Sequence, residues 1–234
     1  MRRIGRLWQL IGLLAMLAFA LTGCMQADRD VKIASSGAGD YVQVLTFDKA
    51  LYDAAPDASR VALAEYGTFI AAHGGSFSHT EAAEHVIWRF DWPFTSLGEL
   101  SARFNQEPNL TASNGIPSGH DQLSITSNRT LFNATYHAQG TVSFPQLTNT
   151  QVNPDAFKDA KETLTLEFPV GVIAATGGTI SGAAVTYTTT LGQTTRIDAT
   201  ASGVNWASTA PLLIAAMLLL FLAVYGLSQL FRGE

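Results

Sequence analysis

Two long apolar runs, residues 10–21 and 210–227, lie near the ends of this 234-residue chain, and mixed polar and apolar positions fill the rest. The second run is uncharged, and as an α-helix it would measure about 27 Å against a hydrocarbon core of about 30 Å. Trp206 and Tyr225 place amphipathic rings near its ends, and Pro211 falls where we expect the first helical turn. The pattern predicts one transmembrane helix over residues 207–231.

The first apolar run has the layout of an export signal, because Arg2, Arg3 and Arg6 precede it. It ends in Leu21-Thr22-Gly23-Cys24, which resembles the bacterial lipobox, where the cysteine receives a diacylglycerol and the preceding peptide is removed. Cys24 is the only cysteine, so it has no disulfide partner within the chain. We therefore expect residues 1–23 to be a lipoprotein signal peptide and Cys24 to be lipidated. The alternative is an uncleaved N-terminal membrane helix with an incidental cysteine.

These two ends predict where the protein resides. The export signal places residues 24–206 on the extracytoplasmic side of a bacterial plasma membrane, and residues 232–234 form a cytoplasmic tail. Arg232 beyond the span agrees with the excess of basic residues on the cytoplasmic side of membrane proteins. A lipid at one terminus and a spanning helix at the other predict a domain that is held close to its membrane at both termini.

Two helices are predicted in the outer domain. Asp57 opens an alanine-rich helix that stops at Gly74-Gly75. A shorter helix over 97–104, capped by Ser96 or Thr95, has its apolar residues at helical spacing, and Pro108 bars its continuation.

The remaining periodic segments alternate as strands do. They cover residues 42–47, 77–80, 85–91, 122–126, 131–144, 162–168, 183–191 and 194–201. Turns are expected at 127–128 and 192–193, residues 30–34 are either a first strand or part of a tether, and residues 147–160 form a mobile connection that is a candidate sub-boundary. The fold class is therefore α+β: an antiparallel sheet packed on two helices, a C-terminal β-meander and a single transmembrane helix.

Charge limits the partners of the outer domain. Between Cys24 and Trp206 the sequence holds 10 basic and 18 acidic residues. Nucleic acid is therefore not an expected partner. The excess of acidic residues also disfavours binding of anionic headgroups by a cluster of basic residues. Lipid recognition would therefore rest on an apolar cavity or on hydrogen bonds to a polar head.

Several stretches together resemble the LppM-type bacterial envelope lipoproteins. They are the lipobox with a strand after it, the step Phe90-Asp91-Trp92-Pro93-Phe94-Thr95-Ser96-Leu97 from strand to helix, Leu164-Thr165-Leu166-Glu167-Phe168-Pro169, and the strand over 183–191. The resemblance implies a membrane-anchored α/β domain in a family linked to envelope lipid or glycolipid binding. It transfers no catalytic residue.

Catalytic and metal chemistry find little support in the sequence. His79, Glu81, Glu84 and His85 are the one dense titratable cluster, but their spacing matches no familiar zinc motif and is typical of a polar hairpin tip. Ser118-Gly119-His120-Asp121 cannot converge as a catalytic triad because its members are adjacent. We expect no enzyme, no metal and no cofactor other than the covalent diacylglycerol on Cys24.

A set of aromatic residues carries the candidate binding site: Phe69, Phe77, Trp88, Phe90, Trp92, Phe94 and Phe104. Such a set forms either an ordinary core between sheet and helix or the lining of an apolar pocket. The leading hypothesis is a non-enzymatic module that binds an envelope lipid or glycolipid. The alternative is an accessory subunit that docks on another membrane protein.

Overall fold

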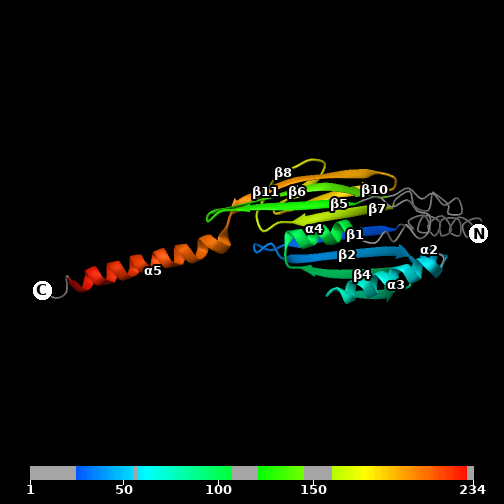
Figure 1. Ribbon diagram of the computed structural model, residues 1–234, viewed down its shortest axis with the longest axis horizontal. Helices are drawn as coiled ribbons and strands as arrows, with labels where there is room; N and C mark the ends of the chain where they lie inside the picture. The colour runs from blue at the N-terminus through cyan, green and yellow to red at the C-terminus, as the bar shows by residue number, and fades with distance from the viewer. Residues whose placement is uncertain (1–24, 55–56, 107–120, 145–159, 231–234) are drawn as a thin grey trace, which may run out of the picture.

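The computed structural model of the chain describes residues 25–54, 57–106, 121–144 and 160–230 and has an α+β architecture, as the sequence predicts (Figure 1). The signal peptide, the lipobox with Cys24, and residues 147–159 of the expected connection lie outside the described residues. Within these described ranges, two sheets and three helices form the domain, and a fourth helix leaves it at the C-terminal end.

Seven strands form the large sheet, in the spatial order β3 (Ser76–Glu81), β4 (His85–Phe94), β2 (Gly39–Asp48), β1 (Gln26–Ile33), β7 (Lys161–Glu167), β10 (Ala184–Thr190) and β9 (Thr179–Ser181). Neighbouring strands are antiparallel, except that β1 and β7 run parallel. The segment after Cys24 is thus a central strand, which decides between the strand and the tether that the sequence left open.

The small sheet has four strands, in the order β5 (Gln122–Arg129), β6 (Asn133–Ser143), β11 (Thr194–Val204) and β8 (Val172–Ala175). The expected turn after β10 exists, with Gly192 at a φ of 75°. It carries the chain from the large sheet to the small sheet, so β10 and β11 are not hydrogen-bonded neighbours. The C-terminal strands are therefore shared between two sheets, which an alternation pattern cannot distinguish from a hairpin.

Four helices are described: α2 (Lys49–Ala54), α3 (Asp57–Ala72), α4 (Leu97–Gln106) and α5 (Trp206–Leu230). The sequence pattern predicts α3, α4 and α5, whereas α2 was not expected. The residue that could have indicated the start of α2 is Asp48. Its carboxylate accepts a hydrogen bond from the backbone N–H of Leu51 at 3.1 Å, as an N-cap does.

One hydrophobic core joins the two sheets and the helices. Strict alternation in β4 buries Val86, Trp88 and Phe90 and leaves Ile87 and Arg89 on the other face, as predicted. Helices α3 and α4 contribute buried side chains to the same core, so only one face of this part of the large sheet is open to solvent.

Helix α4 covers the edge of the small sheet. The backbone N–H groups of Leu123 and Ile125 on edge strand β5 donate to Asn105 Oδ1 at 2.8 Å and Ser101 Oγ at 3.4 Å. The cap of α4 is Ser96, whose Oγ accepts from the N–H of Glu99 at 3.2 Å. Hydrogen bonds from the hydroxyl and backbone N–H of Thr95 lower the pKa of Glu99. Because α4 covers edge strand β5, that strand cannot pair with a strand of another chain.

Two local predictions were wrong. Residues 127–128 continue β5 instead of forming a turn, because Ser127 and Asn128 pair with Tyr136 and Thr135 of β6. The turn falls at residues 130–132. Pro211 lies in the second turn of α5 rather than the first, because the helix begins at Trp206.

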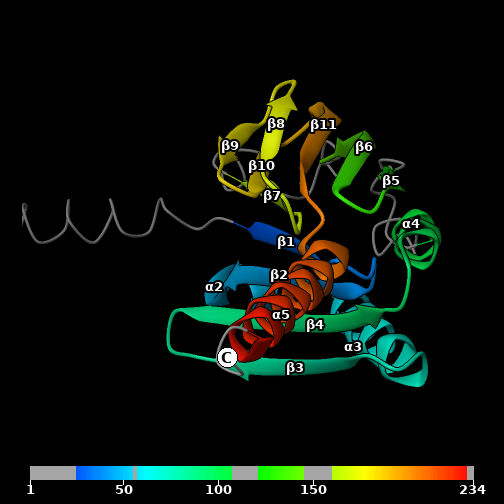
Figure 2. The same cartoon turned by 90° about the vertical axis from the view of Figure 1, so that its left-hand side faces the viewer.

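The long axis of the domain continues into α5 (Figure 1). Viewed from the α5 end, the small sheet lies above the helix, β2 and β4 lie behind it, and β3 lies lowest (Figure 2). Strand β1 begins at the end of the domain remote from α5 and runs toward it (Figure 1). At the near end, Gly37 in the β1–β2 turn approaches Arg129 so closely that an added Cβ would lie 2.7 Å from Arg129 Nη2.

Candidate functional site

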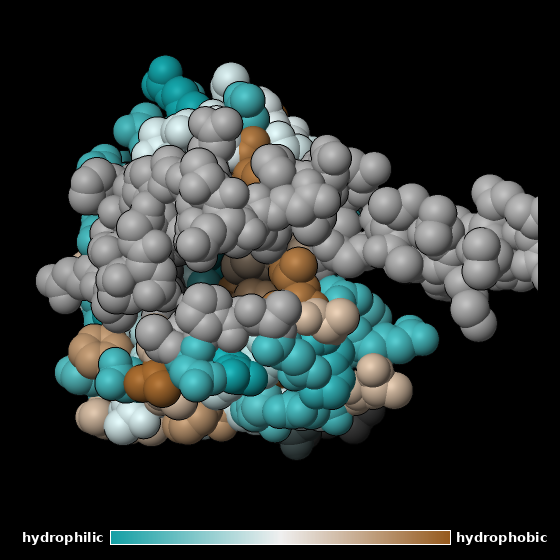
Figure 3. All heavy atoms as spheres, turned by 90° about the vertical axis from the view of Figure 1, so that its right-hand side faces the viewer, coloured by the Kyte–Doolittle hydropathy of each residue, from teal (hydrophilic) through white to brown (hydrophobic). Residues whose placement is uncertain are grey.

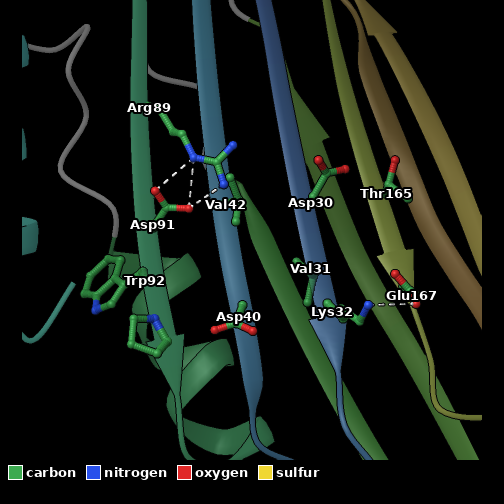
Figure 4. Close-up of a pocket in the computed structure, with 11 residues that line it drawn as sticks. Asp30, Val31, Lys32, Asp40, Val42, Arg89, Asp91, Trp92, Thr165 and Glu167 are labelled. Atoms are coloured by element: carbon green, nitrogen blue, oxygen red, sulfur yellow. Dashed lines mark hydrogen bonds and ion pairs between the residues drawn. The ribbon is translucent and has the colours of Figure 1, made fainter. Parts of the chain in front are cut away.

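A recess of about 570 Å³ lies on the open face of the large sheet, across β4, β2, β1 and β7 (Figure 4). Two rows of paired residues form its floor, and strand pairing explains both. The first row is Asp91, Val42, Asp30 and Thr165, and the second is Pro93, Asp40, Lys32 and Glu167. With strands about 4.8 Å apart, four strands give a floor about 14 Å wide.

Ion pairs line two sides of the recess. Arg89 Nη2 donates to Asp91 Oδ1 at 2.7 Å, and Arg89 Nε donates to Asp91 Oδ2 at 3.0 Å. This contact raises the pKa of Arg89 above its ordinary value, so the guanidinium stays charged. On the other side, Lys32 Nζ lies 3.4 Å from Glu167 Oε1 (Figure 4). Both pairs are largely exposed, so their contribution to stability is small and their polar atoms are accessible to a ligand.

The recess as a whole is acidic. Four carboxylates line it, from Asp30, Asp40, Asp91 and Glu167, against the two cations Arg89 and Lys32. Carboxylates accept hydrogen bonds and the two cations donate them, so the floor can pair with groups such as hydroxyls that do both. Val42 and Pro93 add apolar surface. An excess of negative charge disfavours phosphate or carboxylate ligands.

The recess lies at the end of the large sheet that faces α5. Asp40 and Lys32 pair with each other one step from the β1–β2 turn. That turn approaches Arg129, the last residue of β5, whose turn contacts the start of α5. A group bound in the recess would therefore lie near the point where the chain leaves the domain.

The seven aromatic residues do not line this recess, apart from Trp92, whose side chain faces the core. Trp88, Phe90, Trp92, Phe94 and Phe104 are buried, whereas Phe69 and Phe77 are partly exposed. Neighbouring rings pack directly, as in the edge-on contact of Phe69 with Trp92 at 5.9 Å between centroids. This arrangement favours the core interpretation, and the lined apolar pocket stays a prediction.

The titratable cluster predicted at a hairpin tip lies there, at the β3–β4 turn. His79 stacks on Trp88 with centroids 4.2 Å apart, and Glu81 accepts a hydrogen bond from Lys49 Nζ at 3.0 Å. Within the described ranges, no three His, Cys, Asp or Glu side chains are grouped so that they could hold a metal ion. Of the Ser118–Asp121 segment only Asp121 is described, and it pairs with Arg29.

Helix α5 is long and apolar enough to cross a bilayer. Its segment Trp206–Tyr225 has a mean hydropathy of 2.3, and only 6% of the best window is buried against the rest of the chain. Asn205 caps it: its backbone C=O accepts from the N–H of Ser208 at 3.2 Å and of Thr209 at 2.9 Å. A helix that is apolar on all sides and that is not covered by the rest of the protein is compatible with membrane association.

Comparison with known proteins gives one distant structural likeness. No family model and no curated protein matches the sequence. The NMR structure of the folded domain of LppM from Mycobacterium tuberculosis is similar, with a TM-score of 0.47 and 13% sequence identity over 80% of this chain and 95% of that chain. At this level no ligand and no residue role passes from one protein to the other.

Proposed function

We propose that the chain is a non-enzymatic envelope protein whose outer domain binds the polar head of a neutral glycolipid in the recess on the large sheet. Helix α5 spans the plasma membrane with the C-terminus in the cytoplasm, and a diacylglycerol on Cys24 forms the second anchor. The observation that carries the proposal is the recess itself: a polar, acidic floor at the end of the sheet next to the membrane helix.

The chemistry of the floor suits sugar hydroxyls. A hydroxyl donates one hydrogen bond and accepts others, and the recess alternates carboxylates with Arg89 and Lys32. Its volume of about 570 Å³ lies within the range of about 300–1,000 Å³ typical of small-molecule sites. Asp91 and Glu167 each form an ion pair, whereas Asp30 and Asp40 form none with another described residue, so we assign the main ligand contacts to Asp30 and Asp40.

Position supports a ligand from the same membrane. The recess faces solvent at the α5 end of the domain, where a headgroup standing above the leaflet is within reach. The aromatic face of the sheet is covered by α3 and α4, whose buried side chains join the core. A lipid whose acyl chains stay in the bilayer needs only its head to enter the protein.

Substituting Asp30→Asn together with Asp40→Asn should weaken binding of vesicles that carry a neutral dihexosyl diacylglycerol by at least about tenfold. Hydrogen bonds to charged groups contribute about 1.5–3 kcal/mol each, and about 1.4 kcal/mol corresponds to tenfold in affinity. Binding is measured by microscale thermophoresis with the detergent-solubilised full chain. Glu65→Gln on the exposed side of α3 is the matched control and should leave affinity unchanged.

Two outcomes would contradict this proposal. One is equal affinity of the double variant and the control for the glycolipid vesicles. The other is tighter binding to phosphatidylglycerol vesicles than to the neutral glycolipid, because the acidic floor predicts the opposite order.

The alternative is an accessory subunit whose helix docks on another membrane protein. The exposed surface of α5 includes the small residues Ala215, Ala216 and Ala223, which allow close approach of a second helix. A photo-crosslinker at Ala216 in intact cells should capture only lipid if the glycolipid proposal holds. A discrete protein adduct, absent when the probe is moved to exposed Glu65, would favour the accessory role.

A further inference from the structure

The turn between β5 and β6 is apolar and exposed, which is unusual for a tight turn. Thr130 and Asn133 close it, with the N–H of Thr130 donating to Asn133 O at 2.7 Å and the N–H of Asn133 to Thr130 Oγ1 at 3.0 Å. Between them, Leu131 is 52% and Phe132 is 62% exposed. Turns favour Gly, Asn, Asp and Ser. Two large apolar side chains at this tip therefore indicate a surface that contacts another molecule.

The start of α5 holds this turn in place. The N–H of Asn205 donates to Phe132 O at 2.8 Å, Asn205 Nδ2 donates to Thr130 O at 2.8 Å, and Thr209 Oγ1 donates to Leu131 O at 3.1 Å. Asn205 and Thr209 are buried by this contact. The turn and the first turn of α5 therefore form one rigid unit, and wherever the helix enters a membrane the turn lies beside it (Figure 1).

The same hydrogen bonds make the tip compatible with an apolar environment. Three consecutive carbonyls, of Thr130, Leu131 and Phe132, all accept from groups at the start of α5. A backbone group that enters lipid without a partner costs several kcal/mol, so their satisfaction removes a main obstacle to insertion.

Leu131 and Phe132 also continue an apolar surface. Trp206 at the start of α5 is 63% exposed, and Val204, two residues earlier, is also exposed. Tryptophan at the end of a span is typical of the interface between headgroups and acyl chains. At the opposite end of the domain, by contrast, the described surface is mostly hydrophilic and its apolar residues are scattered (Figure 3).

We propose that Leu131 and Phe132 insert into the outer leaflet beside α5, at the boundary between headgroups and acyl chains, and so fix the orientation of the domain on the membrane. The occupant of this apolar tip is the lipid of the membrane that α5 crosses. The inference rests on the proposed span but adds a contact that the span does not require. It also sets the height of the recess above the leaflet.

The test uses residues 24–234 with Cys24→Ser, which removes the native thiol and the lipid, in phosphatidylcholine–phosphatidylglycerol vesicles. Single cysteines at Phe132, Leu218 and Gln193 carry an environment-sensitive nitrobenzoxadiazole label. Position 218 lies in the middle of the span, and 193 is an exposed turn residue remote from α5. Lipids with a spin label high on the acyl chain should quench the label at 132 and shift its emission to the blue. Lipids labelled deep in the chain should quench position 218, and neither lipid should quench position 193.

Each other outcome has a separate meaning. Quenching at 218 without quenching at 132 overturns the inference and leaves the span intact. Loss of quenching at 218 overturns the span. If position 132 is shielded from aqueous iodide but not quenched by spin-labelled lipid, a protein surface covers the tip instead of lipid, and the inference fails.

Discussion

Replacing Arg29 with methionine should destabilise the folded domain by about 3–5 kcal/mol, the largest effect expected of a single substitution in this chain. Arg29 lies on β1 between the two sheets and is 9% exposed. Its Nη1 lies 2.7 Å from Asp121 Oδ2, and its Nε lies 2.9 Å from Glu162 Oε1. Glu162 is more deeply buried, at 3% exposed, so removal of the guanidinium takes a positive charge away from a buried carboxylate.

The arginine also joins parts of the fold that are distant in sequence. Asp121 Oδ1 accepts from the N–H of Ser143 on β6 at 2.7 Å, so the pair ties β1 and β7 of the large sheet to the small sheet. The guanidinium carbon lies 5.4 Å from the centroid of Phe104 on α4. Its loss should therefore weaken the contact between the two sheets and not only one strand.

Urea unfolding of the detergent-solubilised full chain, followed by near-ultraviolet circular dichroism, measures the effect. Arg60→Met is the matched control, because Arg60 pairs with Asp57 at the exposed start of α3 and should change stability by about 1 kcal/mol or less. Adding Glu162→Gln to Arg29→Met should restore part of the stability, because it removes one of the buried negative charges that faced the guanidinium. A loss below about 1 kcal/mol for Arg29→Met would show that the buried charges find other partners.

Much of the fold follows from local periodicity. The alternation in β4 and the stop of α3 before Gly74-Gly75 are properties of contiguous residues, so the sequence predicts them well. Pairing between distant segments is not encoded locally. The parallel partnership of β1 with β7 and the passage from β10 into a second sheet depend on contacts over more than 100 residues or on the closing of the core.

The candidate site was not predicted, because none of its residues stands out in the sequence when it is considered singly. Asp30, Lys32, Asp40 and Asp91 occupy the polar positions of alternating strands, and only the strand order makes them neighbours. The pattern did contain a signal, since three adjacent strands carry charge on one face. The aromatic residues attracted attention through their size, yet five of the seven are buried.

At the turn between β5 and β6, residues that the sequence placed in a strand lie in a turn instead. The strand predicted over residues 131–144 begins only at Asn133, and the structure places Leu131 and Phe132 in an exposed turn. Turn propensity fails here, because two large apolar side chains lie exposed in a turn next to the apolar helix α5. Such exceptions are expected where residues make a functional contact.

The two proposed anchors would attach at opposite ends of the domain. Met25, bonded directly to Cys24, precedes β1 at the end remote from α5 (Figure 1). The eight residues of β1 alone span about 26 Å along the domain axis. A lipid on Cys24 in the same leaflet therefore requires the domain to lie along the membrane, with a bend in α5 beyond Thr209, because Asn205 and Thr209 hold the first turn of the helix to the domain.

Removing both anchors should convert the protein from fully membrane-bound to soluble, whereas removing either one should not. Deletion of residues 210–234 leaves the cap contacts of Asn205 and Thr209 and a domain that depends on the diacylglycerol. The two acyl chains of the diacylglycerol hold less strongly than a spanning helix but are enough for stable attachment, so most of this variant should stay in the membrane after carbonate washing. Cys24→Ser should abolish lipidation and signal cleavage, and the protein should stay bound through α5 and its retained N-terminal segment.

The decisive variant starts at Gln26 behind a cleavable export signal without a lipobox and ends at Thr209. It should appear in the soluble extracytoplasmic fraction, because neither the lipid nor the span remains. Labelling with an alkyne analogue of palmitate, followed by fractionation and immunoblotting, measures both anchors. If the wild-type chain takes up no label, or if Cys24→Ser takes up as much, Cys24 is not lipidated and the N-terminal anchor is a helix. If the double-truncated chain stays in the membrane after carbonate washing, the domain itself holds the bilayer, which the exposed Leu131–Phe132 tip alone is too small to do.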